Sequence, residues 1–152
     1  MMKFLIILFS IISLNVFSQD INTRKKHFLT EKGVALSGFD ALTYFQGKPQ
    51  KGKKEYSYTQ EGIIYQFSSA SNLETFKKNP SKYEPQYGGW CAYAMGSKGE
   101  KVEVDPETYK IVNGKLYLFY HTFFSNTLTD WNKDEANLKA KADINWEKII
   151  KK

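Results

Sequence analysis

The stretch that decides the fold is residues 62–95, GIIYQFSSASNLETFKKNPSKYEPQYGGWCAYAM. Its alternating apolar positions at 63–67 predict a strand. Ser68 or Ser69 is expected to cap the helix that follows, because a serine hydroxyl accepts from the free N–H groups of a first turn. Asn79-Pro80 is expected to end that helix, since the residue before a proline disfavours helical geometry. The stretch therefore predicts one compact strand–helix unit.

Two β-hairpins are predicted, each followed by a helix. Strands at 55–59 and 63–67 flank Gln60-Glu61-Gly62, and strands at 109–112 and 115–120 flank Asn113-Gly114, the strongest short-range hairpin signal. The remaining elements are expected at 101–105 (strand), 122–131 (helix) and 134–149 (helix). We therefore expect an α+β fold, with a small antiparallel sheet built from two β-hairpin–helix units and C-terminal helices packed on it.

The two hairpin–helix units share a short pattern. A Gly-x-aliphatic-Tyr-x-Phe sequence occurs at 62–67 and again at 114–119. Two explanations fit this match equally well. It is either an internal repeat, or the chance likeness of two aromatic strands that each begin after a glycine.

Residues 1–18, MMKFLIILFSIISLNVFS, are expected to be a secretory signal peptide. A positive charge precedes an apolar run, and Ser18 is small enough to precede cleavage before Gln19. A membrane anchor is less favoured, because the run is shorter than the ~20 residues that span a bilayer. We expect an exported protein, periplasmic or secreted, with no integral membrane segment after cleavage. Its parts are a tether at 19–32 and a single domain at 33–150.

The composition favours a solvated surface and no nucleic-acid partner. The chain carries 22 Lys and Arg against 16 Asp and Glu, a net charge of +6. The lysines are scattered, which is typical of a solvated surface. His27, in a polar and basic segment, is expected to be solvated as well. Cys91 is the single cysteine, so no intramolecular disulfide forms and core packing must supply the stability.

Six motifs occur together along the chain. They are VALSGFD (34–40), Tyr44-Phe45, GxxYxFSS (62–69), Phe76, NPxxY (79–83) and YGGWCA (87–92). In this combination the chain resembles the YHS domain family in its exported, extended form. The resemblance covers the YHS core at 34–95 and the C-terminal extension.

The YHS family is similar to the TRASH-type metal-binding modules, and its cysteine-bearing members carry cysteines at three positions of the metal site. In this chain those positions are Ser37, Ser68 and Asn72. Hydroxyl and amide groups do not replace thiolates as ligands of Cu(I) or Zn(II). The resemblance therefore implies the family's fold without its metal site, and no cofactor is expected.

Cys91 is the first candidate for chemistry. As a nucleophile it would need His121 as its base, with Asp130 or Asp134 as the third member. The plainer interpretation is that Cys91 is a small buried apolar residue.

A second alternative is a copper or zinc site formed by Cys91, Met95 and His121. Thiolate, thioether and imidazole are suitable ligands for these metals, and Cys91 and Met95 share a face if their segment is helical. Met95 is equally suited to filling the core.

The preferred hypothesis is a non-catalytic binding module for an unidentified small molecule or protein. Amphipathic rings such as Trp90, Tyr93 and Tyr117 suit apolar pockets and interfaces. The sequence has no HExxH, nucleotide-binding loop or serine elbow, so no catalytic residues are proposed. The expected ligand-binding residues lie in the turn at 87–91 and at one strand end: Tyr87, Gly88, Gly89, Trp90, Cys91, Tyr120 and His121.

Overall fold

The computed structural model describes residues 20–152, so the predicted signal peptide at 1–18 lies outside the described residues. The first half of the fold contains α1 (Ile21–His27), β1 (Thr30–Glu31), β2 (Val34–Ala35), the 3₁₀ turn η1 (Leu36–Gly38), α2 (Ala41–Phe45), β3 (Lys53–Gln60), β4 (Ile63–Phe67), α3 (Ala70–Lys78) and α4 (Pro80–Tyr83). The second half contains η2 (Gln86–Gly89), α5 (Ala92–Ser97), β5 (Asp105–Val112), β6 (Lys115–Phe119), β7 (His121–Thr122), β8 (Ser125–Asn126), α6 (Thr127–Lys133) and α7 (Glu135–Ile150).

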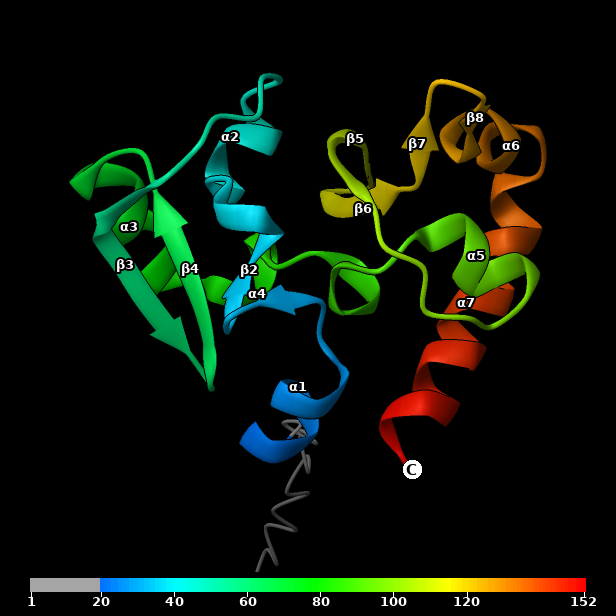
Figure 1. Ribbon diagram of the computed structural model, residues 1–152, viewed down its shortest axis with the longest axis horizontal. Coiled ribbons are helices and arrows are strands. Elements are labelled where there is room, and N and C mark those ends of the chain that lie inside the picture. The colour runs from blue at the N-terminus through cyan, green and yellow to red at the C-terminus, as the bar shows by residue number, and fades with distance from the viewer. Residues whose placement is uncertain (1–19) are drawn as a thin grey trace, which may run out of the picture.

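The strands in the described part of the chain form one four-stranded sheet and two further hairpins. The sheet has the order β1-β2-β4-β3, in which β2 and β4 are parallel and the other pairs are antiparallel. β5 pairs with β6 and β7 with β8, both antiparallel. The sheet and the helices α5, α6 and α7 lie on opposite sides of the molecule, with β5–β6 between them (Figure 1). The predicted α+β class is confirmed, and the two predicted hairpins belong to different sheets.

Both predicted hairpins form with two-residue loops. Gln60 pairs with Ile63 across Glu61-Gly62, and Val112 pairs with Lys115 across Asn113-Gly114. All four loop residues have positive φ, as a type I′ turn requires. Glycine at the second position meets this requirement without steric cost.

The strand β6 is buried on both faces and joins two hydrophobic cores. Leu116 and Leu118 point into the N-terminal core, which includes Phe67 and Phe76. Tyr117 and Phe119 point the other way, into the C-terminal core around Met95, Trp131 and Ala142. All four β6 side chains are at most 1% exposed. Because side chains alternate along a strand, one short strand thus holds the two halves together.

The predicted C-terminal helix at 134–149 forms as α7 and packs through an apolar stripe. Leu138 and Ala142 are buried, and Trp146 and Ile149 pack on the same core. The predicted helix at 122–131 is partly wrong, since 121–126 form the β7–β8 hairpin and α6 begins at Thr127. The predicted strand at 101–105 is also misplaced, because β5 begins at Asp105.

The segment predicted as a tether contains α1 and β1. The side chain of Arg24 is buried and pairs with Glu84, with 2.5 Å between Nη2 and Oε2. The Tyr65 hydroxyl donates to the same Glu84 oxygen at 2.6 Å. Two donors on one carboxylate compensate the cost of burying the charges, so α1 is fastened to β4 and to the residue after α4.

The carboxylate of Asp40 joins two turns that lie far apart in the sequence. Its side chain is fully buried. Oδ1 accepts from the Leu42 N–H at 2.9 Å, which caps α2. Oδ2 accepts from the N–H and hydroxyl of Ser68, both at 2.7 Å, and from Nδ2 of Asn72 at 2.8 Å. A buried charge is tolerated when its lone pairs are used in this way, and the four bonds fix α2 against the start of α3.

Replacing Asp40 by Asn is expected to lower the free energy of unfolding by about 3 kcal/mol, because the amide turns a donor toward groups that are themselves donors. Urea unfolding checks this loss. Asp20→Asn is the matched control, since Asp20 is an exposed N-cap of α1 and asparagine caps as well as aspartate. A D40N variant as stable as D20N would contradict the role given to Asp40.

Candidate functional site

Cys91 is closed off from solvent and hydrogen-bonded. It is 0% exposed, and its Sγ accepts from the Tyr120 N–H at 3.3 Å. The Thr127 hydroxyl donates to the Tyr120 carbonyl at 2.7 Å, so the Cys91 S–H donates to Thr127 Oγ1 at 3.4 Å. These contacts use the protonated thiol as a donor, which is the environment of a structural cysteine rather than of a nucleophile.

His121 lies outside this ring of hydrogen bonds. The Thr108 hydroxyl donates to Asp105 at 2.7 Å, so Nδ1–H of His121 donates to Thr108 Oγ1 at 2.8 Å. Asp130 pairs with Lys133 and Asp134 accepts from Asn137. In the part of the chain that the structure describes, no hydrogen bond or ion pair joins His121 to Cys91 or to either of these aspartates.

The alternative metal ligands also point to different environments. Met95 follows Cys91 by one helical turn, with its N–H on the Cys91 carbonyl at 3.0 Å, and is fully buried in the C-terminal core. His121 is exposed. Between residues 20 and 152 no group of three or more His, Cys, Asp or Glu side chains is placed to hold a metal ion.

The positions that the YHS resemblance relates to a metal site have other roles. Ser68 and Asn72 are donors to Asp40, while Ser69 caps α3 by accepting from the Asn72 N–H at 3.1 Å. Ser37 is exposed in η1, and its carbonyl accepts from the Lys51 ammonium. At two of these positions the hydrogen bonds of the Asp40 carboxylate join the start of α2 to the turn before α3.

The predicted binding turn at 87–90 is largely a packing junction. The Tyr87 hydroxyl donates to Asp143 of α7 at 2.8 Å, and Trp90 Nε1 donates to the His27 carbonyl at 2.6 Å. A Cβ on Gly88 would lie 2.9 Å from the Trp146 ring and 3.0 Å from Phe28. Gly88 therefore permits α1 and α7 to approach the turn.

His27 is buried, so the prediction that it is solvated is wrong. Its Nδ1 lies 2.9 Å from Lys101 Nζ, and an ammonium only donates, so neutral His27 is the acceptor. Burial lowers the pKa of His27, and the charges of Lys101 and Lys26 lower it further. Burial also lowers the pKa of Lys101.

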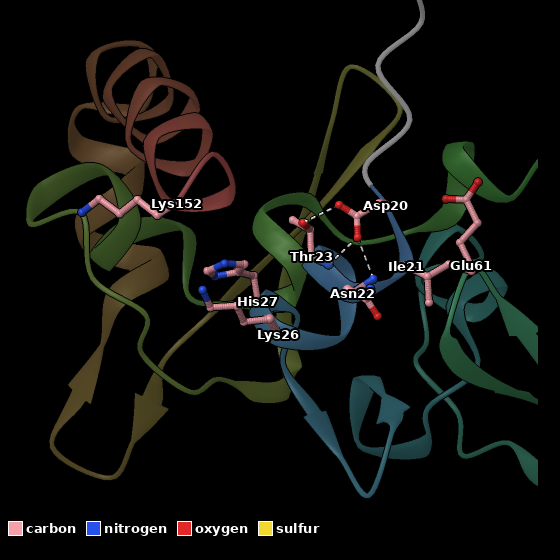
Figure 2. A pocket seen from close by; sticks show the side chains of 8 residues that line it. All are labelled: Asp20, Ile21, Asn22, Thr23, Lys26, His27, Glu61 and Lys152. Atoms are coloured by element: carbon pink, nitrogen blue, oxygen red, sulfur yellow. Dashed lines mark hydrogen bonds between the residues drawn. The ribbon is translucent and has the colours of Figure 1, made fainter.

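An open hollow of about 730 Å³ lies beside α1 (Figure 2). Apolar and polar groups share its lining. Figure 2 shows the Asp20 carboxylate already bonded to Asn22 and Thr23. Ile21 is its single large apolar side chain, and the hollow is wide open to solvent, so it would enclose little of a ligand's surface.

A smaller and more enclosed pocket of about 250 Å³ is lined by apolar and polar groups in about equal parts. We call it the β2–β6 pocket. Six apolar side chains from six separate segments line it: Leu29, Val34, Leu36, Pro85, Val104 and Leu118. Gly89 contributes part of the wall and is the one predicted ligand-binding residue found there. The pocket exceeds the apolar cavity of about 150 Å³ that holds benzene in another protein, so one ring fits.

The backbone at one wall of the β2–β6 pocket is strained. Leu36 and Ser37 are consecutive, line the pocket and have φ of 57° and 50°. Non-glycine residues in this region cost of order 1–3 kcal/mol each and cluster at ligand-binding sites. The Lys51 ammonium on the Ser37 carbonyl and the Phe39 N–H on the Leu36 carbonyl help to hold the turn.

Sequence analysis misses most of the β2–β6 pocket. Leu29 lies in the segment predicted as a tether, and Val104 lies in the one predicted as a strand. Lys32-Gly33, both with positive φ, form the loop of the β1–β2 hairpin that brings Leu29 and Val34 together. This two-residue loop ending in glycine is the one local signal that could have indicated the hairpin.

The β7–β8 hairpin carries an exposed aromatic pair. Phe123 is 95% and Phe124 is 93% exposed, and their rings meet edge to face at 5.1 Å. Residues 120–129 contain no Asp, Glu, Lys or Arg. This tip is free for contact with another molecule and lies on a different element from every wall of the β2–β6 pocket.

No family model, no curated protein and no solved structure matches this chain. The resemblance to the YHS family therefore stays a prediction. Among residues 20–152, none of the helices is long and apolar enough to cross a membrane.

Acid is expected to weaken the fold through His27. Because its folded pKa lies below the ordinary value of 6.5, the unfolded chain binds the proton more tightly. Stability is therefore full above pH 6.5 and is lost as the pH falls toward the lower folded pKa. NMR titration of the His27 ring measures that pKa directly.

Lys101→Met should raise the His27 pKa, because it removes one of the charges that lower it. The exposed Lys98→Met is the control and should leave it unchanged. A His27 pKa at or above 6.5 in the unmodified chain would contradict the environment described here.

The exposed ring of Phe123 is expected to contribute nothing to folding. Phe123→Ala should change the free energy of unfolding by at most about 0.5 kcal/mol. The buried Phe119→Ala is the matched comparison and should cost about 3–5 kcal/mol. Urea unfolding distinguishes the two, and a large loss in F123A would show that this ring is buried in solution.

Proposed function

We propose that this chain is an exported, YHS-like, non-catalytic binding module, and that its small-molecule ligand occupies the β2–β6 pocket. The observation that carries the proposal is the pocket itself: a concave space with both apolar and polar walls, formed where the β1–β2 hairpin, η1, β6 and the segment before β5 meet. Ligand sites have this character, with apolar walls and a few polar groups at the rim.

The strained turn at Leu36-Ser37 supports the same location. The fold maintains two left-handed residues in succession at the pocket wall, although ordinary turn residues would avoid the strain. Asp40 lies two residues beyond η1 in the chain, so its hydrogen bonds fix the position of this wall.

The surroundings of Cys91 and His121 support a non-catalytic role. The thiol is enclosed and donates to Thr127, and the imidazole is bound to Thr108. A thiol-dependent reaction needs the nucleophile and the base in contact with each other and with substrate. The pocket lining contains neither residue.

Single-ring probes test the pocket. Benzyl alcohol, benzylamine and benzoate are added in turn to the ¹⁵N-labelled mature protein, and amide signals are followed by NMR. At least one probe should shift the amides of Leu29, Val104 and Leu118 in a saturable manner. Val104→Phe fills the pocket and should abolish these shifts.

Val102→Phe is the control, because Val102 is two residues away and does not line the pocket. It should retain the shifts, and the unfolding transition of both variants confirms that they fold. The proposal fails if no probe shifts these amides, or if the shifts persist unchanged in V104F.

A further inference from the structure

The charged side chains that line the β2–β6 pocket are both acidic. They are Glu31, at the end of β1, and Glu103, in the segment before β5. No lysine or arginine lines it, although bases outnumber acids 22 to 16 in the whole chain. The charged side chains of the lining are therefore opposite in sign to the net charge of the protein, and a base close by is Lys51, whose ammonium is bound to the carbonyl of the lining residue Ser37.

Neither carboxylate is neutralised by the protein. Among residues 20–152, the side chains of Glu31 and Glu103 form no hydrogen bond or ion pair, whereas those of Glu84 and Glu135 each pair with a base. Both side chains are exposed, so they keep their hydration while standing beside the apolar walls. Two unpaired negative charges at the rim of an apolar space are complementary to a cation with an apolar body.

We propose that the β2–β6 pocket binds a small organic cation: an ammonium group held at the rim by Glu31 and Glu103, on an apolar body of about one ring. This inference rests on the proposed function and adds the ligand's chemical class. The apolar body removes its surface from water mainly against Leu29, Val34 and Val104, which are half-buried, and the ammonium remains partly solvated, so its binding carries little desolvation cost.

The closing experiment compares the three probes by calorimetry at pH 7 and low salt. They share one ring and differ in charge: benzylamine is a cation, benzyl alcohol is neutral and benzoate is an anion. Benzylamine should bind about tenfold more tightly than benzyl alcohol, because two partly exposed ion pairs each contribute modestly, and benzoate should bind weakest. The preference should shrink as salt is added.

Glu31→Gln and Glu103→Gln keep the shape of the pocket and remove one charge each. Each should reduce the preference for benzylamine several-fold while leaving the affinity for benzyl alcohol unchanged. Glu100→Gln is the matched control, since Glu100 is exposed, lies in the same connecting segment as Glu103 and does not line the pocket. It should have no effect on either probe.

The outcomes separate this inference from the function on which it rests. If benzyl alcohol binds the pocket as tightly as benzylamine, or if E31Q and E103Q behave like E100Q, the cation assignment is wrong and the binding module stands. If no probe binds and V104F changes nothing, both proposals are wrong.

Discussion

The fold depends on one buried charge. Asp40 has no exposure to solvent, and a carboxylate in that position is stable only if donors surround it. The Leu42 N–H, both donors of Ser68 and the Asn72 amide supply them. These groups come from the start of α2 and from the turn between β4 and α3, so satisfying the charge requires both turns to be in place.

The strand β6 provides the second constraint, and together with Asp40 it places the pocket. Leu118 faces the N-terminal core and also lines the β2–β6 pocket. The opposite wall belongs to β2 and to η1, whose strained residues immediately precede the segment that Asp40 holds. The pocket therefore has a rigid floor and a fixed wall, with two charged rim residues contributed by connecting segments. A site built in this way can select a ligand by shape and charge without any catalytic group.

Local signals in the sequence predict the elements that depend on neighbouring residues. Gly62 and Asn113-Gly114 define the loops of two hairpins, Asn79-Pro80 ends α3, and the stripe of Leu138 and Ala142 marks the buried face of α7. Contacts between residues that lie far apart in the sequence leave no local pattern of this kind. Phe123 and Phe124 lie in the segment predicted as a helix, yet they form the tip of the β7–β8 hairpin and both rings are exposed. The pairing of Asp40 with Ser68 and the meeting of Glu31 with Glu103 at one pocket depend on tertiary structure, so no local pattern indicates them.

The most direct test of this account is a double-mutant cycle between Asp40 and Asn72, read as free energies of unfolding in urea. Asp40→Ala, Asn72→Ala and the double variant isolate the interaction of the two side chains from their other contacts. The account predicts a coupling of about 1.5–3 kcal/mol, the contribution of a hydrogen bond to a buried charge. If the two losses add to within about 0.5 kcal/mol, the side chains act independently, and the carboxylate does not join the two turns.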